Sequence, residues 1–488
     1  MTTEFFKLRN GQYIMSEYAS KRFSSIVDSN PDYNSELRWD EMSMAELFAD
    51  IYKDDTRYCT EHKCWYTYNG SVWERDLGSL IASERMKEFT RLLHLYAGEI
   101  EEEERAKDFK TFTAKLGDRR ARDRMLKDAC SVYPIRATQF DDNPYLINCK
   151  NGTYDLQKMA FRPATAEDFI TMQTNFEYTL SKDLKFERWD RFISEIMCDD
   201  KELIDFLQRA LGYSILGKGS EECMFIAYGA TTRNGKGTLF NTLFRMLGDY
   251  AKAPQVNMIC KGKFDTDISK PNPALCSLQG SRFVTLSEPP ENALLDEEAI
   301  KNYTGGDPVT TRQLYGEVFT FMPQFKMWLS CNTLPAVSDK TIFSSDRIKL
   351  IEFNRHFTES ERDTSLKSKL LEPNATKYIF KWLLDGYRKY KKYGLKQPER
   401  MKTAVSMYER ENDKVASFFE EKCKRDGQAQ VTGMALYVAY KNWCKENGFG
   451  AKGSTNFYKE FTRFATKVRP NGTIHFNGVT LKTVLGGK

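Results

Sequence analysis

The chain has 488 residues, of which 41% are hydrophobic and 29% are charged. This length predicts two to four domains at about 100–200 residues each, and the composition is that of a water-soluble protein with packed cores. The sequence holds no long apolar run and no basic N-terminal segment followed by an apolar stretch, so we expect no membrane span, no export signal and a cytoplasmic location.

The net charge of +5 is unevenly distributed along the chain. Residues 401–488 carry 15 Lys and Arg against 8 Asp and Glu, a net of +7, whereas residues 1–400 carry 58 against 60, a net of −2. A basic C-terminal segment on a near-neutral body favours a module that faces nucleic acid, although a plain basic surface has the same composition.

The first 180 residues mix helical patterning with short strands, and we assign 1–180 to an α+β N-terminal domain. Asn-Gly between aromatic or apolar runs is a strong hairpin signal, and it occurs twice. The predicted elements are helices at 43–52 and 79–130, the second broken by the acidic run 99–108, and strand pairs around Asn69-Gly70 and Asn151-Gly152.

Residues 181–395 alternate strands with helices, which predicts a mainly parallel α/β sheet. In chain order we expect a helical stretch at 185–215, a strand, turn and helix at 222–248, a strand at 282–288, a helix at 296–303, a hairpin, strands at 325–332 and 347–353, and a helix at 365–394. Residues 396–401 are interpreted as a linker. The predicted fold class is therefore multidomain α/β, with a central domain built on this sheet.

Residues 400–488 predict three helices followed by a two-stranded hairpin, the pattern of a winged helix. The third helix would enter the major groove and the hairpin would touch the DNA backbone. The positive face would be formed by Lys459, Arg463, Lys467 and Arg469. A winged helix that docks another protein is the competing interpretation.

The stretch YGATTRNGKGTLF (228–240) departs from the phosphate-loop pattern G-x-x-x-x-G-K-[ST]. Its two loop glycines are one residue too far apart, and Gly237 stands where a hydroxyl is expected. The context still fits a phosphate site, because an apolar strand runs through a Gly-rich turn into a helix. The predicted nucleotide-binding residues are Gly229, Thr232, Asn234, Gly235, Lys236, Gly237 and Thr238, with Thr238 as the nearest hydroxyl for Mg²⁺.

Three polar residues stand at the ends of the strands that follow. Glu288 ends the strand 282–288, and a carboxylate there suits Mg²⁺ binding and polarisation of water. Asn332 ends the next strand and suits orientation of the attacking water, while Arg347, which starts the last strand, suits stabilisation of transition-state charge from a neighbouring subunit. Each residue alone also fits an ordinary surface position; their order along the chain favours the catalytic interpretation.

The series NGKGT, SE, IKNYTGGDPVTTRQLYG, SCNTLP and DRIKLIEF resembles helicase superfamily 3, and within it the phage- and poxvirus-type primase-helicases. The resemblance covers roughly residues 40–488. It implies an AAA+ ATPase that assembles as a ring, usually a hexamer, around DNA.

Carried over position by position, the resemblance makes Lys236 the phosphate lysine and Glu288 the catalytic acid. Asn332 becomes the sensor asparagine, and Arg347 becomes the trans-acting arginine finger. Thr238 and Glu288 are then the predicted Mg²⁺ ligands. The chain departs from the usual pattern at Gly237 and at Ser287, where many relatives have a hydroxyl residue and a first acidic residue.

The segment TGGDPVTTRQLYGEVFTF (304–321) is predicted to form a hairpin, and the resemblance implies that it projects into the ring channel and grips DNA. Arg312, Gln313 and Tyr315 supply a cation, a polar group and an aromatic ring suited to phosphate and base contact. Lys301 is either another DNA contact or an exposed helix residue.

We therefore expect an ATP- and Mg²⁺-dependent replicative DNA helicase of a phage, virus or mobile element, acting on single-stranded and forked DNA as a homo-oligomer. We find no acidic metal-binding set for nucleotidyl transfer, so a separate primase or polymerase partner is expected. Two alternatives stay open. One is a replication initiator or loader that uses ATP only for assembly, and the other is a non-catalytic interaction protein with a vestigial P-loop.

Overall fold

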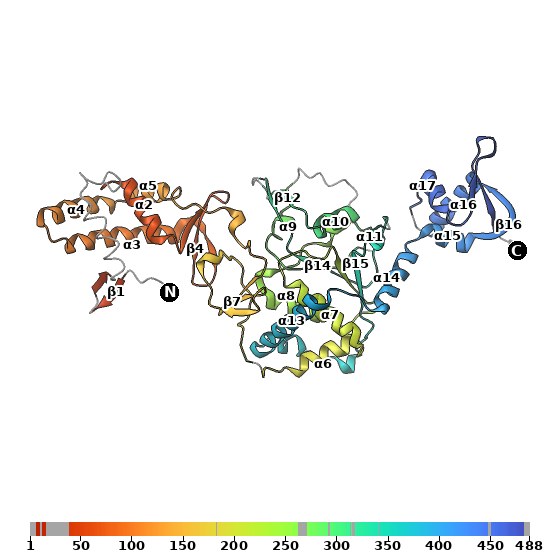
Figure 1. Cartoon of the computed structure of the whole chain (residues 1–488), viewed down its shortest axis with the longest axis horizontal. Helices are drawn as coiled ribbons and strands as arrows, with labels where there is room; N and C mark the ends of the chain where they lie inside the picture. Colours follow the sequence, from red (N-terminus) through yellow and green to blue (C-terminus); the bar gives the residue numbers. More distant parts are fainter. Residues whose placement is uncertain are drawn as a thin grey trace.

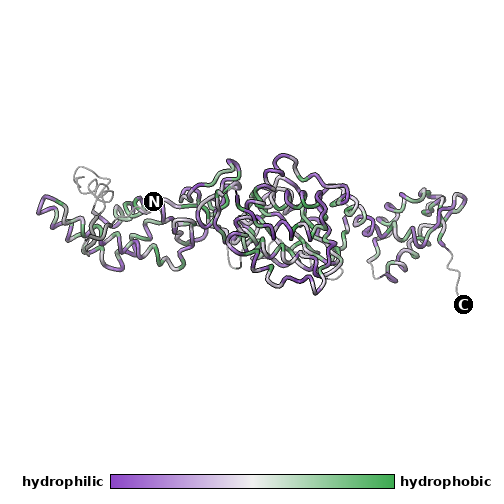
Figure 2. Tube along the Cα trace, turned by 90° about the horizontal axis from the view of Figure 1, so that it is seen from below, coloured by the Kyte–Doolittle hydropathy of each residue, from purple (hydrophilic) through white to green (hydrophobic). Residues whose placement is uncertain are grey.

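The computed structural model describes residues 6–9, 12–15, 39–181, 183–261, 271–290, 293–312, 314, 318–339, 341–447 and 450–482. These residues form an N-terminal module, a central module built on a parallel sheet, and a C-terminal module. The three modules follow one another along the long axis of the molecule (Figure 1 and Figure 2).

The N-terminal module contains four helices, which pack their apolar faces around Phe48, Phe89 and Phe109. They are α2 (Glu41–Tyr52), α3 (Leu80–Tyr96), α4 (Glu103–Leu116) and α5 (Arg119–Ala129). The predicted break at the acidic run is confirmed, because α3 ends before it and α4 begins inside it.

This part of the chain also contains two three-stranded antiparallel sheets, and a separate hairpin joins β1 (Phe6–Arg9) to β2 (Gln12–Met15). The sheets comprise β3 (Thr56–Cys59), β4 (Cys64–Tyr68) and β5 (Trp73–Asp76), and β6 (Leu146–Cys149), β7 (Gly152–Asp155) and β8 (Ala160–Arg162). The second of these sheets packs on the central module, because its residues Ile147, Cys149 and Tyr154 are buried in a hydrophobic core of that module. The two predicted strand pairs are confirmed as β4–β5 and β6–β7. The sequence analysis missed β3 and β8, which are too short to show a clear alternation.

The central module is built on five parallel strands in the order β10-β11-β14-β9-β15. They are β9 (Met224–Tyr228), β10 (Ala251–Lys252), β11 (Phe283–Ser287), β14 (Lys326–Cys331) and β15 (Ile348–Glu352). Both faces are covered, which explains why the strands are almost continuously apolar. Because all five strands are parallel, the residues that follow β9, β11 and β14 meet at one edge of the sheet.

Alternate residues of each strand enter separate hydrophobic cores. Phe225 in β9 and Trp328 in β14 enter one core, whereas Met224 and Leu329 enter the other. The first core is covered by α6 (Glu187–Ile196), α7 (Lys201–Ser214), α8 (Lys236–Leu247), α12 (Leu366–Lys369) and α13 (Pro373–Tyr393). The second is covered by α9 (Pro273–Cys276), α10 (Glu297–Thr304), α11 (Thr341–Ser344) and α14 (Glu399–Glu411).

The predicted helical stretch 185–215 is two helices. Cys198 and Asp199 between them have positive φ values of 52° and 58°, which an α-helix excludes. Asp200 then caps α7 by accepting hydrogen bonds from two backbone N–H groups of its first turn. The stretch 365–394 is likewise divided, because Pro373 starts α13.

The linker predicted at 396–401 is wrong, because these residues include the start of α14. Pro398 is the N-cap of this helix, and Tyr408 is buried in the second core of the central module. Arg400 lies 3.3 Å from a carboxylate oxygen of Asp200, which adds a polar contact to the same packing. Helix α14 therefore lies with the central module.

The C-terminal module packs three helices on a three-stranded antiparallel sheet of order β16-β18-β17. Its elements are α15 (Lys414–Lys422), β16 (Cys423–Thr432), α16 (Gly433–Glu446), α17 (Ser454–Phe461), β17 (Thr466–Val468) and β18 (His475–Leu481). The predicted helices and terminal hairpin are present, and β16 is an additional strand. Its mostly exposed, polar sequence gave no strand signal.

The predicted hairpin of the central module is β12 (Val309–Arg312) paired antiparallel with β13 (Val318–Phe321). Short 3₁₀ helices lie at Leu77–Ser79, Ala97–Glu99, Ala137–Gln139, Ala166–Asp168, Gly248–Tyr250, Val256–Ile259, Glu359–Glu361 and Pro470–Gly472. Among the helices of the described ranges, none has both the length and the apolar character needed to span a bilayer.

Candidate nucleotide-binding site

The loop between β9 and α8 is closely packed at its first glycine and open after Lys236. A Cβ atom at Gly229 would collide with the side chain of Asn234 and lie 2.9 Å from Nζ of Lys236. Gly235 has a φ of 84°, and a Cβ atom there would collide with Ile196. By contrast, nothing lies within 4 Å of a Cβ atom built at Gly237, so the chain is accessible at the start of α8.

The side chain of Asn234 forms hydrogen bonds with the backbone of the loop. It is buried, and its amide nitrogen donates a 2.5 Å hydrogen bond to the carbonyl oxygen of Thr231. Its Oδ1 accepts a 3.4 Å hydrogen bond from the backbone N–H of Lys236. Asn234 therefore shapes the backbone of the loop from a buried position.

The start of α8 has the features of an anion site. Gly235 is the N-cap and supplies no side chain to bind the free N–H groups of the first turn. These N–H groups and the helix dipole favour negative charge at this position. Thr238 lies in the same turn and is half-buried, which places a residue with a hydroxyl group next to the predicted phosphate position.

The side chain of Lys236 joins the loop to the neighbouring strand. Its buried ammonium donates hydrogen bonds to the carbonyl oxygens of Gly229 (3.2 Å) and Cys331 (3.0 Å) and to Oδ1 of Asn332 (2.9 Å). Burial lowers the pKa of Lys236. The strand order explains this meeting, because β14, which ends at Cys331, pairs directly with β9.

Glu288 lies at the same edge of the sheet, one strand further away. It follows β11, has a φ of 51°, and donates its backbone N–H to the carbonyl oxygen of Ser330 at 3.0 Å. With neighbouring strands about 4.8 Å apart, β11 lies roughly 10 Å from β9. Both Glu288 and Ser287 are exposed, so the side chain of Glu288 is accessible at this edge of the sheet.

Arg347 lies at the opposite end of the strands, where the parallel strands of the sheet begin. It precedes β15, and the five residues of that strand place it about 16 Å from the edge at which the P-loop begins. Its guanidinium donates a 2.8 Å hydrogen bond to Oγ1 of Thr304 and is paired with Glu222. The structure therefore brings Lys236 and Asn332 together and leaves Arg347 away from them within one chain.

The predicted DNA contacts of the hairpin are only partly described. Arg312 ends β12 and is half-buried, and Leu314 is exposed. Gln313 and Tyr315 lie outside the described residues. The ammonium of Lys301 is bonded to Asp339 and Thr341. This favours the interpretation of Lys301 as a helix residue over that of a DNA contact.

The four basic residues predicted for the C-terminal module have different surroundings. Lys459 and Arg469 are exposed, and the ammonium of Lys467 lies 5.7 Å from the ring centre of Tyr458. The guanidinium of Arg463 donates two hydrogen bonds to Asp413, at 2.6 and 3.0 Å. Arg463 thus ties α17 to the start of α15, and its contact with DNA stays a prediction.

Three protein families match separate segments of the chain. The family described as "D5 N terminal like" matches residues 45–198, which run from α2 to just past α6. A family of unknown function matches residues 227–347, from the end of β9 to Arg347. The family described as "Poxvirus D5 protein-like" matches residues 410–477, most of the C-terminal module.

Viral proteins are similar over most of the chain. "Putative helicase L207/L206" of Acanthamoeba polyphaga mimivirus is 26% identical over 446 residues, which covers 84% of this chain and 46% of that protein. "Putative helicase 121R" of Invertebrate iridescent virus 3 is 23% identical over 498 residues, covering 87% of this chain and 52% of the relative. The chain is therefore similar to D5-type viral proteins over most of its length. It spans about half the length of these two curated relatives.

A solved structure has the same overall fold as this chain. It is the A-form apo structure of the C-terminal region of NrS-1, with a TM-score of 0.50 and 11% sequence identity. The match covers 90% of this chain and 99% of that region.

The sequence analysis missed the residues that hold the P-loop from outside. The ring Nδ1 of His356 lies 2.9 Å from the carbonyl oxygen of Thr232, and since a carbonyl only accepts, Nδ1 carries the proton. Arg233 has a φ of 56° and pairs with Glu359 at 2.6 Å. The sequence signal that could have found residues 356–359 is their position directly after β15. The end of β15 lies beside the end of β9, where the P-loop begins.

Proposed function

We propose that this chain is an ATP-dependent DNA helicase of a virus, phage or mobile element that works as a ring, with a hexamer as the expected form. The observation that carries the proposal is the contact between Lys236 and Asn332 at the ends of two adjacent parallel strands, with Glu288 on the next strand. A phosphate-binding lysine, a polar sensor and an acid then share one edge of the sheet. The names of the viral relatives support the same activity class.

The residues present fit ATP and Mg²⁺. The uncapped start of α8, the open backbone at Gly237 and the ammonium of Lys236 are suited to bind phosphate oxygens. Thr238 supplies a hydroxyl and Glu288 a carboxylate, which are oxygen ligands of the kind Mg²⁺ prefers. When bound, MgATP would supply the phosphoanhydride whose hydrolysis drives the motor. Glu288 would accept a proton from the attacking water, and Asn332 would orient that water.

Arg347 supports the ring form of the proposal. An arginine that stabilises transition-state charge must reach the phosphates, and Arg347 lies at the far edge of its own sheet. A neighbouring subunit can receive this arginine if the N-terminal edge of one sheet faces the P-loop of the next. We propose that ATP binds between subunits in this way, with Lys236 and Glu288 from one chain and Arg347 from the other.

The DNA contacts proposed are the hairpin β12–β13 and the basic C-terminal module. Arg312 of the hairpin would contact single-stranded DNA, together with Gln313 and Tyr315 of the same hairpin. The helices and sheet of the C-terminal module support a winged helix that places Lys459 and Lys467 toward the duplex.

The deciding experiment is an unwinding assay on forked DNA with either a 3′ or a 5′ single-stranded arm. We expect ATP-dependent strand separation on one polarity, and none with the Lys236→Ala variant. DNA-stimulated ATP hydrolysis without strand separation would contradict the helicase and favour an initiator or loader. No hydrolysis by the unmodified chain would contradict both.

A further inference from the structure

Helix α10 leads directly into the hairpin proposed to grip DNA. Only residues 305–308 separate the end of α10 from β12. The segment that follows β14, residues 332–339, begins with Asn332, which contacts Lys236. We call this segment the Asn332 loop. Any contact between α10 and the Asn332 loop therefore joins the candidate nucleotide site to the base of the hairpin.

Backbone hydrogen bonds form the first such contact. The N–H of Ala336 in the Asn332 loop donates to the carbonyl oxygen of Ala293 at 2.7 Å. The carbonyl oxygen of Ala336 accepts from the N–H of Leu295 at 2.9 Å. The residues that enter α10 are thus paired with the Asn332 loop as in a short strand ladder.

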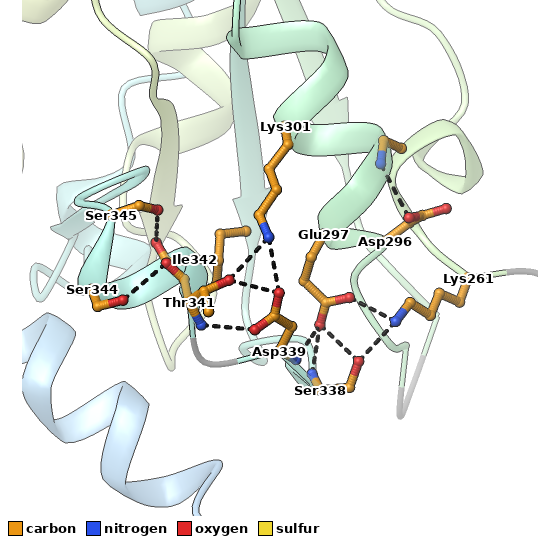
Figure 3. Close-up of polar contacts among 11 residues, drawn as sticks. Lys261, Asp296, Glu297, Lys301, Ser338, Asp339, Thr341, Ile342, Ser344 and Ser345 are labelled. Carbon is orange, nitrogen blue, oxygen red and sulfur yellow. Dashed lines mark hydrogen bonds and ion pairs between the residues drawn. The ribbon is translucent and has the colours of Figure 1, made fainter.

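Glu297, the first residue of α10, forms the second contact (Figure 3). Its side chain is buried, and Oε1 accepts hydrogen bonds from the N–H of Ser338 (2.6 Å), the hydroxyl of Ser338 (2.9 Å) and the N–H of Asp339 (2.8 Å). Oε2 lies 2.6 Å from the ammonium of Lys261. Burial alone would raise the pKa of Glu297, but these partners lower it overall, so the carboxylate is charged.

Lys301, one turn further along the same face of α10, forms the third contact. Its ammonium lies 2.9 Å from Oδ2 of Asp339 and donates a 2.9 Å hydrogen bond to Oγ1 of Thr341 (Figure 3). Hydrogen bonds from Thr341 and Lys301 lower the pKa of Asp339 to about 2. Two side chains of one helix face therefore hold the same loop.

The last residue of α10 also has a functional neighbour. Oγ1 of Thr304 accepts the 2.8 Å hydrogen bond from Arg347, the proposed arginine finger. Helix α10 is thus bonded at its start to the loop of the sensor asparagine and at its end to the arginine offered to the next subunit. The buried carboxylate of Glu297 would be costly to leave without its partners, so its contacts favour joint movement of α10 and the Asn332 loop over their separation.

We propose that Glu297 and Lys301 are positioning residues that couple the nucleotide state sensed at Asn332 to the hairpin, by making α10 move with the Asn332 loop. This inference rests on the proposed function, because it uses Asn332 as the sensor and the hairpin as the DNA grip. It reassigns Lys301 from a DNA contact to a coupling residue.

The test is a charge exchange between Lys301 and Asp339, measured on the full chain. The variants are K301E, D339K and the double variant K301E/D339K, with E297Q as a separate probe of the buried carboxylate. Each is assayed for ATP hydrolysis without DNA, for its stimulation by single-stranded DNA, and for base pairs separated per ATP hydrolysed. Thermal unfolding shows whether each variant is folded.

We expect the three single variants to hydrolyse ATP without DNA at a near-normal rate and to lose DNA stimulation by at least about fivefold, in the range of typical coupling between sites. The double variant should regain most of the stimulation, because the ion pair is restored with reversed charges. Normal stimulation in D339K, with loss of DNA affinity in K301E alone, would overturn the proposal and return Lys301 to the DNA-contact interpretation. Equal loss in the double and single variants would also overturn it.

A second measurement does not depend on variants that fold. Hydrogen exchange of the unmodified chain is compared with and without a non-hydrolysable ATP analogue, with Lys236→Ala as the control. Binding should change exchange in peptides from 293–312 as well as in the P-loop. A P-loop response with no response in 293–312 would overturn the coupling alone. A chain that shows both responses yet separates no DNA strands would instead overturn the proposed function.

Discussion

Oδ1 of Asn332 accepts a 2.9 Å hydrogen bond from the ammonium of Lys236, although 96 positions separate the two residues in sequence. Asn332 directly follows β14, so this contact joins the end of that strand to Lys236, the proposed phosphate-binding lysine. We expect Asn332→Ala to lower the rate constant of ATP hydrolysis by about 10²–10³-fold, as for removal of one preorganised polar group from a catalytic site. ATP affinity should change by a few-fold at most, whereas Lys236→Ala should lose it. Equilibrium binding of a fluorescent ATP analogue and steady-state ATPase separate the two effects.

Thr333→Ala is the matched control for this prediction, because Thr333 is the exposed neighbour of Asn332 in the same loop. It should leave both quantities unchanged. An Asn332→Ala variant with normal turnover would remove Asn332 from the site and leave its contact with Lys236 a structural one.

The exposed carboxylate of Glu288 gives the second prediction. Glu288→Gln keeps the size of the side chain and removes its ability to accept a proton. We expect ATP to bind with near-normal affinity and turnover to fall by at least about 10²-fold, the usual contribution of a positioned general base. Glu298→Gln, an exposed acid on α10, should have no effect. Unchanged turnover in Glu288→Gln would transfer the role to another group.

Arg347 and Lys236 lie at opposite edges of one sheet, which gives the third prediction. Arg347→Ala and Lys236→Ala chains should each be inactive in ATP hydrolysis, and a mixture should regain part of the activity, because some interfaces then pair an intact P-loop with an intact arginine. The loss in Arg347→Ala alone should be large, about 10³-fold or more. Arg388→Ala, at an exposed arginine, is the control. A mixture as inactive as its parts would argue against a shared site.

Several features of the fold could be predicted from local sequence patterns. The apolar strand before the P-loop, the amphipathic helix after it and the two Asn-Gly hairpins all depend on residues close in sequence, and the structure confirms these elements. The sequence pattern at 396–401 favours a linker, whereas in the structure α14 begins at Glu399, directly after Pro398. Proline is common at the start of a helix, and the sequence alone did not show that Tyr408 would be buried against the sheet.

Long-range partners could not be predicted in the same way. Lys301 meets Asp339, 38 positions away, only because α10 packs beside the end of β14. Glutamate is a residue type that is usually exposed to solvent, yet Glu297 is buried by the loop that follows β14. The order of strands in the sheet decides such meetings, and single-sequence patterns do not fix that order. The same limit applies to Arg463, whose partner Asp413 is 50 positions away.

The ion pair of Lys301 and Asp339 gives a prediction for acid unfolding. Hydrogen bonds from Thr341 and Lys301 lower the pKa of Asp339 to about 2 in the folded chain, below its ordinary value of 3.8. A lowered folded-state pKa means that this stabilisation is complete above pH of about 4 and is lost as the pH falls toward 2. Asp339→Asn should remove that part of the acid dependence and leave stability near neutral pH modestly lower. An identical acid-unfolding curve for the variant would contradict the assignment.

Lys459 and Arg463 lie four positions apart in the C-terminal module and should behave differently on substitution. Lys459 is exposed, so Lys459→Ala should weaken DNA binding equally for all sequences and reduce the slope of log affinity against log salt by about 1. Arg463 is bonded twice to the nearly buried Asp413, so Arg463→Ala should lower the unfolding free energy of the module by about 1–3 kcal/mol with little change in slope.

Removing every residue after Asn412 should abolish most of the salt dependence of DNA binding while preserving ATP hydrolysis, because α14 stays with the central module. Salt titrations of DNA binding, together with urea unfolding of each variant, distinguish the roles. A truncated chain with an unchanged salt slope would favour a C-terminal module that docks protein rather than DNA.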